Sequence, residues 1–370
     1  MFDMSVVAGF LAGGVVGVIV ERLIGKPLDH LILNRLRNAW TLTRQKKLEK
    51  DFSLKDNSVI IGRTALHVRE FVHNGFGPNS IATSIQDEIG DIKSHLSNML
   101  PPLEEIERAT AVNRKILNDD PRMWNGTSLA LVRADVGRDS ATEASNLTLT
   151  FHENEYARHI AISQHWENLP IQQRRGLDGN QLRVVDPIVS TSFGLNCTLE
   201  TADGRLLLTK RSVLTYGSHD RWHISFNEGL SKLDRLPGSR IDLYHAFARG
   251  LREEIGLEES QIENFRERLK VHTLILDVDR YQWGLLAHLD LRDTEITSTA
   301  IQVGRNLGAA HDDWESSQIR FIKFTDSVEE VLTEISRANE WSAHGLLNLA
   351  LSAIIRHPNR AHEIRQALLR

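Results

Sequence analysis

The sequence has one cysteine, Cys197, among its 370 residues. A disulfide bond needs two cysteines, so none can form within the chain, and a reducing compartment fits best. No histidine stands at a spacing that indicates a Cys–His pair. We therefore interpret Cys197 as a small buried hydrophobic residue and not as a nucleophile.

Strong charge bias and the common cofactor motifs are also absent. The net charge is -5 with 25% charged residues, which gives no general reason to expect nucleic-acid binding. The sixteen histidines form no His-Glu-x-x-His motif and no Cys/His cluster, so the sequence gives no sign of a zinc site. A phosphate-binding loop with a Walker lysine and an internal repeat are missing as well.

The N-terminus is the exception to this ordinary composition. Residues 4–20 carry no charge, which is about the shortest run that can span a membrane, and further apolar residues extend it to residue 24. We predict a transmembrane helix over residues 4–24. Basic residues prevail between Lys26 and Lys50, so the positive-inside rule predicts a single-pass protein with its N-terminus outside and its body cytoplasmic. A helix buried in the globular body is the alternative.

Small residues recur in this segment. Gly9, Gly13 and Gly17 lie four residues apart, a stripe that lets two helices approach closely in lipid. The stripe predicts a homodimer, although glycine is also generally frequent in membrane helices. Residues 27–51 have the pattern of a basic amphipathic helix, which would lie along the membrane or pack on the globular body.

The rest of the chain indicates an α/β (α+β) protein with two regions. Residues 53–183 form a predicted accessory domain, with helices over 81–100 and 103–117 and a strand over 147–151. Residues 184–370 interleave strands with a few helices, which is typical of a mixed α/β domain. In this region Asp203-Gly204 is the signal of a tight hairpin turn.

One segment carries a recognisable motif. Residues 249–257 read Arg-Gly-Leu-Arg-Glu-Glu-Ile-Gly-Leu. The segment resembles the second half of the Nudix box, Arg-Glu-U-x-Glu-Glu-x-Gly-U with U aliphatic, the helix by which Nudix hydrolases hold divalent metal on a diphosphate. Gly250 departs from it, because the family carries a catalytic glutamate there. Ile241 and Arg235 also stand where the consensus has glutamate and glycine.

The resemblance extends from about residue 184 to the C-terminus. The Asp203-Gly204 hairpin precedes the motif and the predicted strand 319–324 follows it, in the family's order. The resemblance implies an α/β/α sandwich with a mixed sheet in residues 184–370. It also implies a substrate in which a nucleoside diphosphate is linked to another moiety, with Mg²⁺ or Mn²⁺ as cofactor.

The chemistry of diphosphate hydrolysis requires hard cations, which bind carboxylate oxygens and make hydroxide available near neutral pH. We expect Glu253 and Glu254 to be metal ligands and catalytic residues. Glu228 is the expected replacement for the carboxylate that Gly250 lacks, as a third metal ligand, and Glu315 is the expected catalytic base. A solvated helix end is the alternative for the Glu253-Glu254 pair.

Three further residues are expected to bind substrate. Arg211 would meet the phosphates, Trp222 would stack on a base, and Arg249 lies one helical turn before Glu253, within pairing reach. A solvated strand end and a buried aromatic residue are the alternatives for Arg211 and Trp222.

Three functions remain open from the sequence. The first is a membrane-anchored Nudix-type hydrolase on the cytoplasmic face. The second is a catalytically impaired module that binds a nucleotide or nucleotide-sugar as a sensor, and the third is a structural adaptor. Glu253 and Glu254 favour the first function, whereas Gly250 favours the second.

Overall fold

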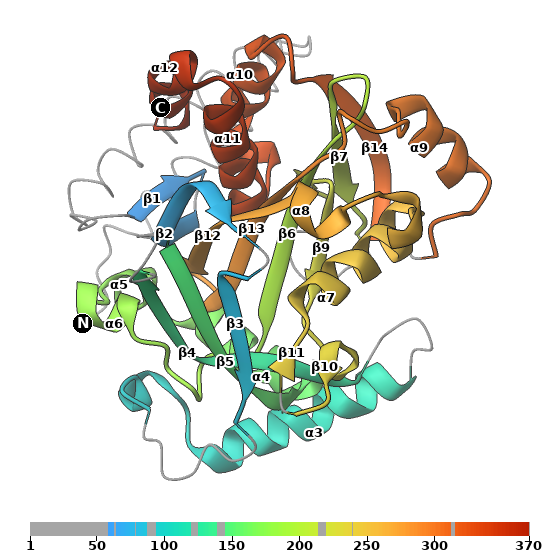
Figure 1. The fold of residues 1–370 in the computed structure, drawn as a ribbon. Helices are drawn as coiled ribbons and strands as arrows, with labels where there is room; N and C mark the ends of the chain where they lie inside the picture. The colour runs from blue at the N-terminus through green and yellow to red at the C-terminus, as the bar shows by residue number, and fades with distance from the viewer. Residues whose placement is uncertain are drawn as a thin grey trace, which may run out of the picture. The chain divides into compact units, whose positions relative to one another are not determined.

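The computed structural model describes residues 58–62, 64–77, 79–86, 94–119, 125–138, 145–213, 220–238, 240–311 and 315–369 (Figure 1). The predicted helices 4–24 and 27–51, with Gly9, Gly13 and Gly17, lie outside these residues. Leu54–Arg370 forms one compact unit.

A nine-stranded mixed sheet is the main element of this unit. Its order is β1 (Ser58–Ile61), β2 (Thr64–Phe76), β12 (Leu269–Asp277), β13 (Gln282–Asp290), β6 (Phe193–Glu200), β7 (Arg205–Arg211) and β14 (Ser316–Lys323). Two shorter strands join it, since β8 (Trp222–Ile224) pairs with β7 and β9 (Phe226–Gly229) pairs with β6. β13 and β6 are parallel, whereas the other pairs are antiparallel.

The turn between β6 and β7 is the one that the sequence predicts. Gly204 has φ of 69°, a conformation that favours glycine, and its backbone N–H donates to the carbonyl of Thr201. A Cβ at this position would also lie 2.8 Å from the hydroxyl of Thr325. The hairpin signal is therefore confirmed.

The two faces of the sheet bury separate hydrophobic cores. Leu285 and Ala287 of β13 belong to one core and Leu286, between them, to the other, as strand alternation requires. The first core includes α7 (Leu243–Gly250). The second is covered by α10 (Glu329–Ser336), α11 (Ala343–Arg356) and α12 (Ala361–Leu368), which gather near the C-terminus in Figure 1.

A second, three-stranded sheet shares the first core. Its order is β3 (Ile81–Ile85), β5 (Ser145–Glu155) and β4 (Thr127–Arg138). Phe151 of β5 packs edge-on against Phe193 of β6, with ring centroids 5.1 Å apart. The neighbouring helices are α3 (Leu103–Asp119), α4 (Tyr156–Asn168), α5 (Ile171–Arg175) and α6 (Gly179–Arg183). The remaining elements are the hairpin of β10 (Arg235–Leu236) and β11 (Arg240–Ile241), with α8 (Phe265–Arg268) and α9 (Ser298–Asn306).

The structure corrects the expected fold class and localisation. Within the part of the chain that the structure describes, no helix has both the length and the apolar character needed to cross a bilayer. This finding stands against the expected transmembrane architecture and the single-pass membrane localisation. The fold is a mixed α/β arrangement around one large sheet, and β2, from the expected accessory region, pairs with β12 in that sheet. The limits 53–183 and 184–370 stay predictions.

Two local predictions have opposite outcomes. The helix predicted over 103–117 is confirmed as α3. The helix predicted over 81–100 is wrong at its start, because residues 81–85 form β3, which pairs in parallel with β5.

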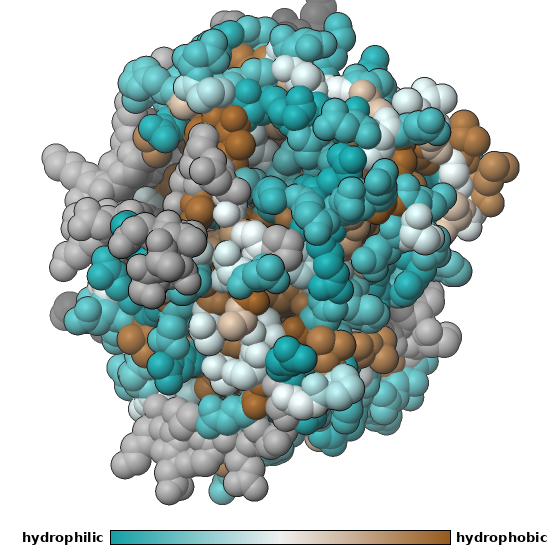
Figure 2. Space-filling model, viewed as in Figure 1, coloured by the Kyte–Doolittle hydropathy of each residue, from teal (hydrophilic) through white to brown (hydrophobic). Residues whose placement is uncertain are grey.

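The face shown in Figure 2 is largely hydrophilic, and its apolar side chains occur in scattered patches, as expected when most apolar side chains of the protein fill the two cores.

Candidate functional site: a carboxylate cluster beside helix α7

The motif segment forms the end of α7 and a π-helical turn that follows it. Asp242 caps the start of α7 by accepting hydrogen bonds from the backbone N–H groups of Tyr244 and His245, at 2.9 and 3.2 Å. From residue 251 the helix widens into the π turn η3 (Leu251–Ile255) and ends at Gly256, which has φ of 82°. Short π-helical segments are frequent at functional sites, because they change the direction of neighbouring side chains.

Arg249 is the centre of the polar contacts at this helix end. Its Nη1 lies 2.7 Å from Oε1 of Glu228 and 3.7 Å from Oε2 of Glu253. Its Nη2 donates to Oδ2 of Asp234 at 3.0 Å and to the carbonyl of Gly229 at 2.9 Å. Since only 10% of its side chain is exposed, Arg249 compensates negative charge inside the protein and not at its surface.

The structure explains why residue 250 is a glycine. A Cβ at this position would lie 2.7 Å from Cδ2 of Phe226 and 3.3 Å from Cβ of Glu228. The ring of Phe226 is fully buried and cannot easily move aside. Glu228 therefore lies directly beside the position where the Nudix pattern places its missing glutamate.

The carboxylates of the cluster are shielded from solvent and repel one another. Burial raises the pKa of Glu228 to about 8; Arg249 opposes this shift, and Glu253 and Glu315 add to it. Burial also raises the pKa of Glu254 well above its usual range, and the charges of Glu315 and Glu228 add to that shift. The cluster thus combines low solvent access with repulsion between acidic groups, a combination typical of functional sites.

Glu254 is fixed by the neighbouring strand. Its side chain is buried, and its Oε1 accepts a hydrogen bond from the backbone N–H of Asn227 in β9, at 3.1 Å. Glu253 is more open, with 27% of its side chain exposed. The two adjacent glutamates of the motif therefore occupy different environments, one inside the cluster and one at its edge.

Arg211 ends β7 and Glu315 directly precedes β14, the adjacent strand, and the charges of both act on the cluster. The carbonyl of Glu315, just before β14, accepts from the backbone N–H of Ser212, at the end of β7. The positive charge of Arg211 lowers the pKa of Glu254, while the negative charge of Glu315 raises it. Both expected residues therefore act electrostatically on the buried glutamate of the motif.

Trp222 lies elsewhere. It is paired in register with Lys210 and packs against the core that α10, α11 and α12 cover, on the opposite face of the sheet from α7. The guanidinium of Arg320 lies 4.2 Å from the centroid of its ring. The structure therefore does not bring Trp222 to the carboxylate cluster, and its expected role in base stacking stays a prediction.

The sequence alone did not single out Asp234. Its side chain is fully buried and contacts Arg249, while His245 Nδ1 lies 3.0 Å from its second oxygen. Its Oδ2 also accepts from the backbone N–H of Ser231, at 2.9 Å. The available signal was the Ser231-x-x-Asp234 spacing, which resembles a capping box.

The cluster has the oxygen donors that a hard divalent cation prefers, but these donors are not arranged around one point. Carboxylate oxygens are the ligands that Mg²⁺ and Mn²⁺ prefer, and a cation would relieve the repulsion among Glu228, Glu254 and Glu315. Among the described residues, however, no group of three or more His, Cys, Asp or Glu side chains is arranged to hold an ion. Arg249 accounts for part of this arrangement, because it draws the carboxylates of Glu228 and Glu253 toward itself.

Comparisons with known proteins give no family assignment. No family model matches the chain, and no curated protein matches it either. Among solved structures, DR0079 from Deinococcus radiodurans is similar over 48% of this chain and 83% of its own, with 13% identity and a TM-score of 0.28.

A bifunctional NMN adenylyltransferase/ADP ribose pyrophosphatase from Francisella tularensis is similar over 53% of this chain and 45% of its own, with 10% identity and a TM-score of 0.29. A second structure of that protein, complexed with AMP and Mn ion, covers 45% of this chain and 41% of its own, with 10% identity and a TM-score of 0.28. This chain thus spans less than half of the Francisella protein, and TM-scores this low do not establish a shared fold.

Proposed function

We propose that this chain is a metal-dependent hydrolase of Nudix type, which cleaves the diphosphate of a nucleoside diphosphate linked to another moiety. One observation carries the proposal. The glutamates of the motif meet Glu228 and the charge of Glu315 beside α7, where burial and mutual repulsion raise the pKa values of Glu228 and Glu254. Such a cluster is costly for the folded protein unless it serves a ligand or a reaction.

The residues divide into three roles. Glu228, Glu253 and Glu254 would hold Mg²⁺ or Mn²⁺, which when bound neutralises phosphate oxygens and lowers the pKa of a water molecule. Arg211 and Arg249 would bind oxygens of the diphosphate, because a guanidinium matches two phosphate oxygens at once.

Glu315 is the proposed base that accepts a proton from the attacking water. Glu315 directly precedes β14, apart from the motif helix in the chain, and its charge raises the pKa values of Glu228 and Glu254, which supports this role. The water forms a bond to phosphorus, and the bridging oxygen leaves with the second phosphate.

The test is hydrolysis by the full chain of a panel of nucleotide-sugars, dinucleotides and nucleoside triphosphates, with Mg²⁺ or Mn²⁺. The matched pair is Glu254→Gln and Glu259→Gln, since Glu254 is buried in the cluster and Glu259 is exposed in a short 3-10 helix that follows the motif. Turnover that Glu254→Gln abolishes and Glu259→Gln preserves supports the proposal. Turnover that both variants retain contradicts it.

A second function has a specific observation in its favour. The ring of Phe226 excludes a side chain at residue 250, and Arg249 already neutralises Glu228 and Glu253. A site of this kind would bind a nucleotide or nucleotide-sugar without cleaving it, as a sensor. Saturable, metal-dependent binding of one compound of the panel, with no product formed, would select this function over hydrolysis.

A further inference from the structure

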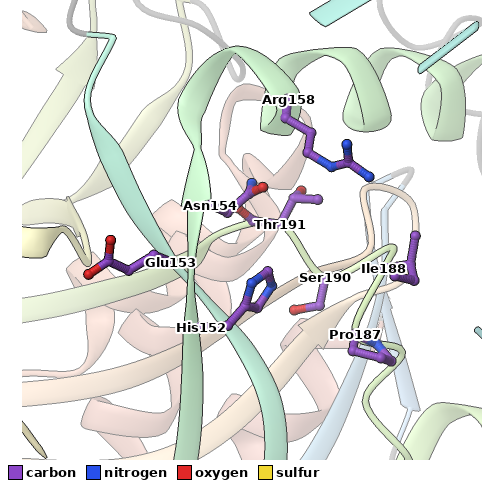
Figure 3. A pocket seen from close by; sticks show the side chains of 8 residues that line it. All are labelled: His152, Glu153, Asn154, Arg158, Pro187, Ile188, Ser190 and Thr191. Atoms are coloured by element: carbon purple, nitrogen blue, oxygen red, sulfur yellow. The ribbon is translucent and has the colours of Figure 1, made fainter. Parts of the chain in front are cut away.

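A cavity of about 260 Å³ lies beside β5, apart from the residues of the carboxylate cluster. It is lined by two groups of residues and one arginine between them in the chain: His152, Glu153 and Asn154 of β5, Arg158 at the start of α4, and Pro187, Ile188, Ser190 and Thr191 (Figure 3). None of these residues belongs to the sequence motif. The volume is just below the range of about 300–1,000 Å³ that is typical of small-molecule sites, so the cavity suits a compact ligand.

Two buried polar groups in this cavity have no hydrogen-bond partner among the described residues. They are Nε2 of His152, whose residue is 9% exposed, and Oγ of Ser190, whose residue is fully buried. In Figure 3 the His152 ring and the Ser190 side chain face the same space. An unsatisfied buried polar group destabilises a folded protein, so two of them lining one cavity indicate a missing partner.

The other polar groups of the lining already have partners. Nδ2 of Asn154 donates to the carbonyl of Thr191 at 2.8 Å, and Oγ1 of Thr191 lies 2.9 Å from Nδ1 of His159. Glu153 points away from the space in Figure 3 and contacts Arg235 at 2.8 Å. The unsatisfied hydrogen-bonding capacity is therefore concentrated at His152 and Ser190.

Arg158 gives the cavity a positive charge. Its Nη1 lies 2.6 Å from Oε1 of Glu107, an ion pair in which the Glu107 side chain is 56% exposed. A guanidinium has further donors beyond that one contact. Burial lowers the pKa of His152; the backbone of Glu153 and of Ser190 opposes this shift and the charge of Arg158 adds to it. The net shift is downward, so the imidazole is neutral near pH 7 and supplies hydrogen bonding without a second charge.

We propose that this cavity binds a small organic anion, either a carboxylate or a phosphate monoester. Its oxygens accept hydrogen bonds from Arg158 and from the hydroxyl of Ser190, and a polar group beside them bonds Nε2 of His152. Pro187 and Ile188 supply an apolar side of the lining for a short carbon chain. The proposal is independent of the hydrolase activity, because it uses no residue of that site.

The test is titration calorimetry of the full chain with propionate and, separately, with methyl phosphate; 1-propanol is the neutral comparison. We expect saturable binding of one anion and none of the alcohol. Ser190→Ala and Arg158→Gln should each weaken binding about tenfold or more, as expected for the loss of a charge-assisted or buried hydrogen bond.

The controls are close by in the structure. Ser163→Ala removes another buried hydroxyl, which bonds His159, and Arg114→Gln removes another arginine, which pairs with Glu155; neither residue lines the cavity. Both controls should bind like the wild type. Ser190→Ala should also keep or raise the melting temperature, because it removes an unsatisfied group, whereas loss of a structural hydroxyl would lower it.

Either of two results overturns the proposal: neither anion binds saturably, or the Ser190→Ala and Arg158→Gln proteins bind as well as the wild type. The anion that binds more tightly shows whether the cavity prefers a carboxylate or a phosphate monoester. Should the variants not fold, the NMR signals of His152 in the wild-type protein decide. A change in their chemical shifts on addition of one anion supports the site, and unchanged chemical shifts with both anions reject it.

Discussion

A Cβ on Gly250 would lie 2.7 Å from Cδ2 of Phe226, closer than side-chain carbons approach in folded proteins. The glycine is therefore a packing requirement of this chain and not a simple loss of a functional residue. The same Cβ would lie 3.3 Å from Cβ of Glu228. Glu228 of β9 therefore carries a carboxylate close to the helix position where the Nudix pattern has a glutamate. A carboxylate supplied by Glu228, and not by residue 250, is compatible with both hydrolysis and binding without hydrolysis.

Restoring the consensus residue should damage the protein. We expect Gly250→Glu and Gly250→Ala to lower the free energy of unfolding by about 1–3 kcal/mol, because the new side chain overpacks the buried ring of Phe226. In an unobstructed helix, glycine to alanine would instead stabilise by about 1 kcal/mol. Urea unfolding measures the sign, and Gly179→Ala is the control, since nothing lies within 4 Å of a Cβ there. A Gly250→Ala protein as stable as the wild type would contradict the packing argument.

The contacts of Arg249 predict a large difference between two arginines of the same helix. Arg249→Gln leaves the fully buried Asp234 without this cation, which should cost about 3–5 kcal/mol of unfolding free energy. Arg252→Gln removes a partly exposed pair with Glu253 and should cost about 1 kcal/mol or less. Chemical denaturation of both variants at pH 7 and low salt makes the comparison. Equal losses would mean that Arg249 is not the centre of the cluster.

The sequence predicted features that depend on local chemistry. The Asp203-Gly204 turn requires a backbone conformation that favours glycine, and it is present. The motif also singled out Arg249, Glu253 and Glu254, which meet beside α7. Each signal is contained in a short stretch of residues, so no long-range pairing is needed to read it.

Features that depend on strand pairing were not predictable in this way. β2 pairs with β12, about two hundred residues later, and nothing in residues 64–76 indicates that partner. The apolar spacing that suggested a helix from Ile81 fits equally well a strand that pairs with β5. Trp222 lies away from the cluster because its register with Lys210 turns it to the other face of the sheet, and register is a property of the folded sheet.

Substitution of Glu254, the buried glutamate of the motif, should lower the activity without lowering the stability. Burial and the charges of Glu315 and Glu228 raise the folded pKa of Glu254, so stability falls as the pH rises above the unfolded value of about 4.3, where the unfolded chain ionises this glutamate and the folded protein holds its proton. Glu254→Gln removes this titration and keeps an oxygen for the N–H of Asn227.

We therefore expect the Glu254→Gln variant to be as stable as the wild type or more stable at pH 7.5. Its turnover should be lower by about a hundredfold or more, because the loss of a proposed metal ligand should cost at least as much as the loss of a group that only orients a ligand. Calorimetric melting and the hydrolysis assay measure the two quantities. A variant that loses stability would show that Glu254 has a mainly structural role.

Two buried histidines predict how stability depends on pH. Nε2 of His223 lies 2.8 Å from Nε2 of His344, so one ring donates and the other accepts, and the accepting ring cannot gain a proton at Nε2 without losing this contact. Burial lowers the pKa of His344 to about 3, with Arg280 and Arg211 adding to the shift, and burial lowers the pKa of His223 well below its usual range.

The unfolded chain takes up protons at these rings below about pH 6.5, whereas the folded protein does not, so stability is fully present above pH 6.5 and falls as the pH falls. Each ring contributes about 1.4 kcal/mol per pH unit to this fall. His344→Gln keeps a group that bonds His223 and should reduce the slope between pH 6.5 and 5 by about one proton. Urea unfolding at several pH values measures the slope, with His362→Gln as the exposed control on α12. If both variants fall as steeply as the wild type, the buried pair does not stay neutral in the folded protein, and the contact between the two rings does not exclude protonation.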